Sequence, residues 1–468
     1  MSVEDKDCLI IWDLDNQWVS GCEDILLWKK YEVLEFDKVY SILQLVEENS
    51  EQLKLQYLAL IYELGESKFN GKRVIESLEV RPGFSYWWMT LLTEKCNLAK
   101  SPQIDSAIKL MAFKKWLENK DYNHIKLVST NVQLAEAVSL IASKLQIDFE
   151  WKKARREQSR KSFVRRTSDR LPYYVQGLVW LIQHLITHWA LKGVGVKEWK
   201  KTKGKTTFIS YLFNLNSDSV KTGHFKSRHW TALPQLLEEC KIESNWLHIY
   251  VKDAVLKNSK EAKNLINQFN QSHVKSQVHV TLHSFLSFKV ILSAIWDWFK
   301  MVRLSKSLGV SLQKNSGSYW PFLKKDYFSS MAGSTLMCNM LYLNLFQSAM
   351  MSLPHQKRGV YLKENQGWEF GFIHSWRAAK HSNNLIGAPH TPSKFWDLRL
   401  YFDKRSYERP DTIYNLPLPD YVGMNGEVSK KMYLDGGYQE SGLIELEALR
   451  YLYLSESVGG NSNLSLGD

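Results

Sequence analysis

Residues with the chemistry of a binding or catalytic site gather in the segment 385–403. A histidine, His390, stands between Pro389 and Pro392, directly after the short apolar run 385–388. The two prolines restrict the backbone, so they would hold the imidazole at the end of a strand. Open α/β sheets bind their ligands at such strand ends. The alternative interpretation is a structural turn capped by the histidine, and the spacing alone does not separate the two.

A carboxylate at the end of another predicted strand is expected beside His390. The segment 359–363 has the pattern of a strand and is followed by Glu364, before a helix predicted over 368–380. The ends of parallel strands meet at one edge of a sheet, so Glu364 and His390 should be neighbours. A carboxylate and an imidazole in contact can act as a base and its orienting group. His390 and Glu364 are therefore the candidate catalytic residues.

Two further groups of side chains are candidates for binding substrate. Trp396, Asp397 and Arg399 follow His390 in a stretch rich in groups that bind sugars and phosphates. Arg228 and Trp230 precede a helix predicted over 233–239, a position suited to an anion or a sugar. For the second group, a helix cap with a packed tryptophan is the alternative interpretation.

The elements that must position these residues alternate between strand and helix, which predicts an α/β fold with a Rossmann-like parallel sheet. We expect one such domain over residues 1–415, with helices on both faces of the sheet. A linker and the start of a second domain should occupy 416–454, and a flexible tail 455–468. The strands expected in the first domain are 124–130, 207–213, 247–251, 278–282, 359–363 and 385–388.

The composition excludes several classes of protein. Hydrophobic residues make up 44% of the 468 residues and aromatic residues 13%, which indicates a large folded core rather than disorder. The net charge of +12 favours an anionic partner. The 5 cysteines are scattered without metal-ligand spacing, so we expect no metal site and a reducing cytoplasm. The first residues lack the pattern of a signal peptide.

A basic run followed by an apolar segment indicates a membrane surface as that partner. Residues 152–170 are strongly basic, and 171–191 is apolar and long enough to span a bilayer. Polar residues on one helical face of 171–191 instead predict a helix that lies in the interface, within an insertion at 152–195. The apolar segment 285–302 is expected to serve the same surface. The candidate membrane-surface residues are Arg155, Arg156, Arg165 and Arg166.

Two other interpretations of the basic run compete with this one. It can be a solvated charge run followed by a core helix. It can also bind nucleic acid, but the sequence has no zinc-finger, helix-turn-helix or RNP pattern to support that use. We therefore expect no nucleic-acid partner.

Five blocks in order resemble a known family. Residues 81–96, 225–233, 361–369, 390–403 and 418–426 follow one another as in bacterial surface-carbohydrate biosynthesis proteins, which are glycosyltransferases of lipopolysaccharide O-antigen clusters. The resemblance covers roughly positions 8 to 454. More distantly, the chain is similar to GT-B transferases that use CMP-activated ulosonic acids of the Kdo or sialic-acid type.

The resemblance implies a site and its substrates. Glu364, His390, Asp397 and Arg399 would line a cleft between two Rossmann-like domains. The donor would be a sugar nucleotide, with no other cofactor, and the acceptor a lipid-linked glycan. The protein would then be cytoplasmic and peripheral on the inner face of the cell membrane.

One departure from the family pattern leaves a second function open. The pattern continues past the block at 449–454 into a second Rossmann-like domain, which would hold the nucleotide. The resemblance thus implies an acceptor-side domain whose nucleotide-binding half is truncated. The alternative function is a non-catalytic glycan-binding or scaffold subunit of the same pathway.

Overall fold

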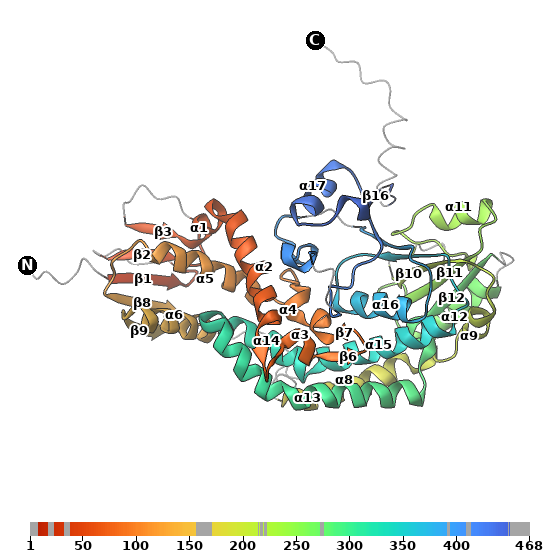
Figure 1. Cartoon of the computed structure of the whole chain (residues 1–468), viewed down its shortest axis with the longest axis horizontal. Coiled ribbons are helices and arrows are strands. Elements are labelled where there is room, and N and C mark those ends of the chain that lie inside the picture. Colours follow the sequence, from red (N-terminus) through yellow and green to blue (C-terminus); the bar gives the residue numbers. More distant parts are fainter. Residues whose placement is uncertain are drawn as a thin grey trace, which may run out of the picture. The chain divides into compact units, whose positions relative to one another are not determined.

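The computed structural model describes residues 8–16, 23–31, 38–155, 171–213, 215, 219, 222–271, 276–390, 394–408, 413–447 and 449. The chain forms two compact units, and each contains its own parallel sheet (Figure 1). The first unit comprises Met1–Gln176, Val302–Gly333 and Phe395–Ser406. The second unit comprises Gly177–Met301, Ser334–Lys394 and Tyr407–Asp468.

The first unit contains a 5-stranded sheet with the order β3-β2-β1-β8-β9. All neighbouring strands are parallel. Alternate residues of the central strand are buried and the others are half-buried, because successive side chains point to opposite faces of the sheet. The strands are β1 (Cys8–Asp13), β2 (Asp24–Leu27), β3 (Val39–Ser41), β8 (His124–Ser129) and β9 (Asp148–Lys153).

Helices and two short antiparallel pairs complete the first unit. The 3-10 turn η1 (Tyr86–Met89) is fully buried and forms an aromatic wedge. The helices are α1 (Ile42–Glu48), α2 (Ser50–Glu66), α3 (Val74–Ser77), α4 (Leu91–Glu94), α5 (Gln103–Leu117), α6 (Val132–Leu145) and α14 (Trp320–Met331). The antiparallel pairs are β4 (Lys68–Phe69) with β5 (Lys72–Arg73), and β6 (Glu79–Arg81) with β7 (Phe84–Ser85).

The second unit contains a 7-stranded parallel sheet with the order β12-β11-β10-β13-β14-β15-β16. From β10 the chain proceeds to β11 and β12 on one side and then returns to β13 on the other. This reversal makes β10 and β13 a topological switch point, where open sheets bind ligands beyond the carboxyl ends of the strands. The strands are β10 (Thr206–Leu212), β11 (Ser244–Tyr250), β12 (Gln277–Thr281), β13 (Arg358–Leu362), β14 (Leu385–Ala388), β15 (Tyr421–Met424) and β16 (Leu443–Glu445).

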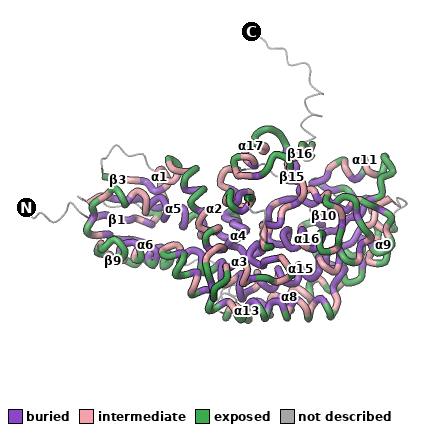
Figure 2. The backbone as a smooth tube through the Cα atoms, viewed as in Figure 1, coloured by how far each residue is buried: buried purple, intermediate pink, exposed green. Residues whose placement is uncertain are grey.

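The core of the second unit lies around the sheet and the packed helices α15 and α16 (Figure 2). Every residue of β11 is buried, and the rings of Phe208 and Trp246 stack at a centroid distance of 4.3 Å. The helices are α9 (Val196–Lys201), α11 (Leu233–Glu239), α12 (Ser259–Gln271), α15 (Ser334–Ser352), α16 (Gly367–Ala378) and α17 (Glu427–Asp435), with most of α8 (Tyr173–His188) and the first half of α13 (Phe288–Ser316).

The prediction of an α/β fold with parallel sheets is confirmed, but the structure divides the strands differently. The predicted strand 124–130 lies in the first unit's sheet, whereas the five later strands lie in the second unit's sheet. Residues 416–454 were expected to begin a separate domain, yet β15 and β16 extend the second sheet beyond β14. In both sheets the strands alternate with helices along the sequence. This alternation does not indicate which strands pair with one another. The GT-B arrangement stays a prediction.

Two glycines before α9 give a test of the second unit's packing. Gly193 and Gly195 both have left-handed φ angles, of +80° and +70°. A Cβ at Gly193 would meet nothing within 4 Å, whereas one at Gly195 would overlap the carbonyl oxygen of His279. We expect Gly193→Ala to lower the free energy of unfolding by about 1 kcal/mol, the cost of the left-handed backbone. We expect Gly195→Ala to lower it by roughly 3 kcal/mol, because overlap adds to that cost. Urea unfolding measures both, and equal losses would contradict the packing described.

Candidate functional site

The carboxyl ends of β13 and β14 bring Glu364 and His390 into contact. In the parallel register Leu362 pairs with Ala388, and each functional residue follows its paired residue by two positions. Glu364 Oε1 lies 3.1 Å from His390 Nε2, and the two side chains are 16% and 7% exposed. The predicted proximity is confirmed, while the catalytic role of the pair stays a prediction.

The loop that carries Glu364 is held by a carboxylate from the next helix. Glu369, in the first turn of α16, accepts hydrogen bonds from the backbone N–H groups of Glu364, Asn365 and Gln366, each 3.0 Å long. Asn365 takes a left-handed φ of 55° to make this turn. The amide of Gln366 donates to Glu364 Oε2 and, at 3.0 Å, to the Tyr211 hydroxyl. The Glu364 side chain therefore has a fixed position before any ligand binds.

Glu369 itself is buried together with a cation. Its side chain and that of Lys363 are fully enclosed, and Lys363 Nζ donates to the Tyr433 hydroxyl at 3.3 Å. Burial raises the pKa of Glu369 and lowers the pKa of Lys363, while the charge of each favours the ionised form of the other. The three backbone donors also favour the carboxylate over the neutral acid. This buried pair is the support beneath the Glu364 loop.

A second histidine borders the imidazole of His390. The rings of His229 and His390 meet edge to face, with centroids 4.8 Å apart. The rings of Phe213 and His229 also meet edge to face, with centroids 5.6 Å apart. Asn425, just past β15, donates to the carbonyl of Pro389 at 3.4 Å. His229 was missed from sequence, although it lies between the two candidates Arg228 and Trp230.

A cavity of about 360 Å³ opens beside the pair on one face of the second unit's sheet. Its floor consists of alternate residues of β10, β13 and β14, and its walls come from α11 and from Leu446, Glu447 and Leu449. His229, His390 and Asn425 lie at the carboxyl end of this cavity, and Thr206 and Arg358 at the amino end. The rest is largely apolar, as in sites for small molecules. The main apolar lining residues are Phe208, Trp230, Leu233, Leu237, Val360 and Ile386.

The predicted binding residues of the 225–233 block have different environments. Trp230 is buried, donates its indole N–H to Ser210 Oγ at 2.8 Å and forms part of the cavity wall. Arg228 is exposed and does not line this cavity. Trp230 is therefore a packed tryptophan, as the alternative interpretation expected, and it also lines the cavity.

The remaining predicted site residues belong to the first unit. Asp397 is buried and accepts two hydrogen bonds from Arg399, at 2.9 and 2.8 Å. The carbonyl of Trp396 accepts a hydrogen bond from Asn97 at 2.9 Å. These contacts fix the turn before η5 (Leu398–Leu400). A role for the three residues in binding substrate stays a prediction.

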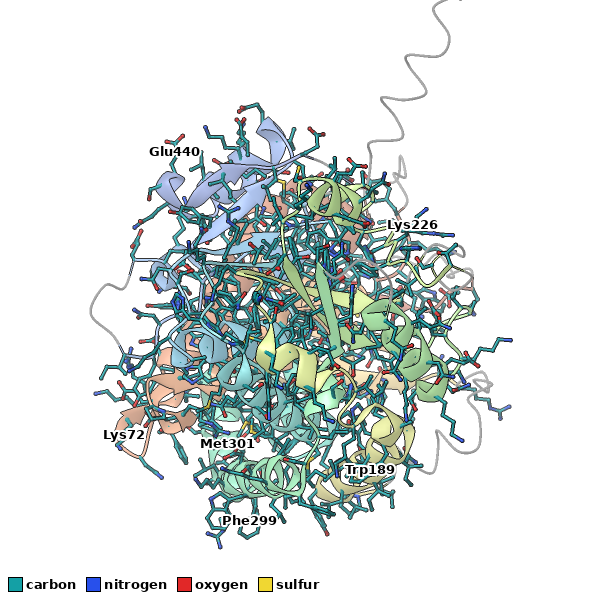
Figure 3. The ribbon with its side chains drawn as sticks, turned by 90° about the vertical axis from the view of Figure 1, so that its right-hand side faces the viewer. Lys72, Trp189, Lys226, Phe299, Met301 and Glu440 are labelled. Carbon is teal, nitrogen blue, oxygen red and sulfur yellow. The ribbon has the colours of Figure 1, made fainter. Side chains whose placement is uncertain are left out.

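An exposed apolar strip runs along α8, η2 (Trp189–Leu191) and the first half of α13. Ile186 is 75% exposed and Phe288 71%, and Trp189 and Phe288 meet edge to face at 6.4 Å. Lys192 lies over both rings, at 4.8 and 5.4 Å from their centroids. Figure 3 labels Phe299 at the lower edge of the molecule and Trp189 in its lower right part. We call this surface the apolar strip, formed by Leu178, Ile182, Ile186, Trp189, Phe288, Leu292, Trp296 and Phe299.

The predicted membrane-surface segment is only partly described. Arg155 is exposed just beyond β9, whereas Arg156, Arg165 and Arg166 lie outside the described residues. Of the polar residues predicted to share one face of α8, His184 contacts the buried His283. Within the described ranges, no helix has the length and apolar character needed to cross a bilayer.

Comparisons with family models, with curated proteins and with solved structures find no match to this chain. The family resemblance of the five sequence blocks therefore stays an expectation. A function is therefore assigned from the structure itself. The basis is the register of β13 and β14 and the contacts around Glu364 and His390.

The buried support of the Glu364 loop gives a second prediction. Glu369→Gln leaves Lys363 buried without its anion, so we expect it to lower the free energy of unfolding by about 3–5 kcal/mol. The double variant Lys363→Met/Glu369→Gln should recover part of that loss, because no buried charge remains. Glu427→Gln, an exposed glutamate in the first turn of α17, is the control and should change stability by less than about 0.5 kcal/mol. Urea unfolding tests this, and a double variant less stable than Glu369→Gln would contradict it.

Proposed function

We propose that this chain is a glycosyltransferase of cell-surface polysaccharide or lipopolysaccharide biosynthesis. It would move a sugar from a nucleotide donor to a lipid-linked glycan. The observation that carries the proposal is the contact of Glu364 with His390 at the end of an apolar cavity, beyond the carboxyl ends of parallel strands. Parallel sheets concentrate ligand chemistry at that edge.

The pair has the groups that sugar transfer needs. The acceptor oxygen bonds to the anomeric carbon, the bond from that carbon to the phosphate oxygen breaks, and the hydroxyl proton needs a base. Glu364 would accept the Nε2 proton of His390, which fixes the ring and leaves Nδ1 as the basic nitrogen. Nδ1 is buried in this structure, so a bound acceptor would have to uncover it. His390 then takes the acceptor proton, and the negative charge departs with the nucleotide phosphate.

The cavity supports a nucleotide as the donor's leaving group. Its apolar floor and the ring of Trp230 suit a flat base, and its size lies in the range of small-molecule sites. Asn425 and Thr206 supply polar groups at its two ends. The family resemblance makes a CMP-activated ulosonic acid the donor that we propose.

The apolar strip supports action at a membrane surface. Aromatic and aliphatic side chains flanked by lysines are typical of helices that lie in the interface between headgroups and acyl chains. Lys192 and Lys300 lie beside the strip's aromatic rings, where they can meet anionic headgroups. We propose that the protein binds the cytoplasmic face of the membrane peripherally, where a lipid-linked acceptor is available.

Substitution of the paired residues tests the transfer reaction. With a CMP-activated ulosonic acid and a lipid-linked acceptor, His390→Ala and Glu364→Gln should each lower the rate of CMP release on the order of 100-fold. Their melting temperatures should change little, because Glu364→Gln keeps the size of the side chain and the His390 side chain borders the cavity. His224→Ala, at an exposed histidine, should keep full activity.

Two outcomes would contradict this assignment. Full activity in both variants would show that the pair does not carry the chemistry. A wild-type chain that binds the lipid-linked acceptor but binds neither CMP nor the CMP-sugar in calorimetry would identify the non-catalytic subunit instead.

Charge insertion into the apolar strip tests the membrane proposal. Ile186→Glu should lower the fraction of protein that floats with anionic liposomes by a factor of about ten or more, because it puts a charge where an exposed apolar side chain would enter the bilayer. Val428→Glu on α17 is the control, since Val428 is also 75% exposed. Flotation at low and high salt separates the apolar from the ionic contribution. Equal flotation of both variants would contradict the role of the strip.

A further inference from the structure

Three histidines meet at the carboxyl end of β12 in the second unit. His184 and His188 are four residues apart on α8, so they occupy one face of the helix. His283 belongs to η3 (Leu282–Phe285), which directly follows β12. One ring nitrogen from each lies within 4.8 Å of the others.

The rings are held close together and in defined orientations. Nε2 of His184 and Nε2 of His283 are 2.8 Å apart. The ring of His188 stacks on both others, with centroids 4.0 Å from His184 and 4.1 Å from His283. Nδ1–H of His188 donates to the carbonyl of His184 at 2.9 Å, which leaves the lone pair on its Nε2. A backbone acceptor on the second nitrogen is the usual way to orient a metal-binding histidine.

His283 is the most enclosed of the three rings. His283 is fully buried, and its Nδ1 has no hydrogen-bond partner among the residues that the structure describes. The nitrogen that faces His184 is Nε2, so His283 would bind a metal through Nε2, and its Nδ1 would carry the proton of the neutral ring.

We propose that His184, His188 and His283 bind a divalent transition-metal ion, with Zn²⁺ the best match. Imidazole is a ligand that zinc prefers, and three histidines with a water molecule make a complete tetrahedral shell. Zinc–nitrogen bonds of about 2.0–2.1 Å place neighbouring ligand nitrogens about 3.3 Å apart. The 2.8 Å separation of His184 and His283 therefore has to widen by about 0.5 Å on binding, and ligand nitrogens up to 4.8 Å apart have to approach by about 1.5 Å.

This site is separate from the proposed transfer site. β12 and β14 are four strand spacings apart in the sheet, which is about 19 Å. The metal would join α8 to the edge of the sheet, because two ligands come from the helix and the third follows β12. The same helix carries Ile182 and Ile186 of the apolar strip on its exposed side. The ion would thus hold in place a helix whose other face is unsupported.

Metal analysis of the full chain, prepared without a purification tag, tests this inference. After chelation and addition of ZnCl₂, gel filtration followed by elemental analysis should give one zinc per chain. Bound Co²⁺ should show the visible absorption bands of a tetrahedral site. Zinc should also raise the melting temperature, since it binds only the folded state.

Variants that keep the ring but remove the lone pair locate the site. His188→Phe and His283→Phe should each weaken zinc binding on the order of 100-fold and abolish the thermal shift. His224→Phe, at an exposed histidine, should bind zinc as the wild type does. If His283→Phe does not fold, the half-buried His188 still provides the test. No zinc on the wild type at micromolar concentration, or unchanged binding by His188→Phe, would overturn the proposal.

Discussion

The site depends on the register of two neighbouring parallel strands. Leu362 of β13 pairs with Ala388 of β14, so the residues two positions beyond each, Glu364 and His390, leave the sheet at the same level. A shift by one residue would turn every side chain of a strand to the other face of the sheet. The cavity floor uses the same register, because its residues alternate along these strands. One pairing therefore positions both the reactive pair and the surface beside it.

A buried charge fixes the conformation of the Glu364 loop. Glu369 binds three backbone N–H groups of that loop, and Lys363 compensates its charge from within the core. The two groups attract one another across the core, and buried charges of this kind are weak sources of stability but can fix a single conformation. Here the pair sets the direction of a loop that emerges at the switch point of the sheet. The arrangement is preorganised, which is the property that catalysis most requires of a scaffold.

The sequence predicted the parts of this account that depend on local pattern. Glu364 and His390 could be placed together because strand ends in a parallel sheet share an edge. The division into two sheets could not be predicted, because strands such as β8 and β10 have the same pattern and differ only in their partners. Asp397 and Arg399 were grouped with His390 because they are near it in sequence, yet they belong to the other unit. The histidine cluster on the inward face of α8 was also missed. Two histidines four residues apart do not indicate a metal site by themselves, and the third ligand, His283, is distant in sequence.

A crystal structure of the chain with CMP tests the central claim most directly. We expect density for the base in the cavity that Trp230 and Ile386 line, with a phosphate oxygen about 3 Å from the amide nitrogen of Asn425. We also expect the Glu364 loop to keep its position, since Glu369 already holds it. An empty cavity at saturating CMP, or the nucleotide bound away from His390, would contradict the account.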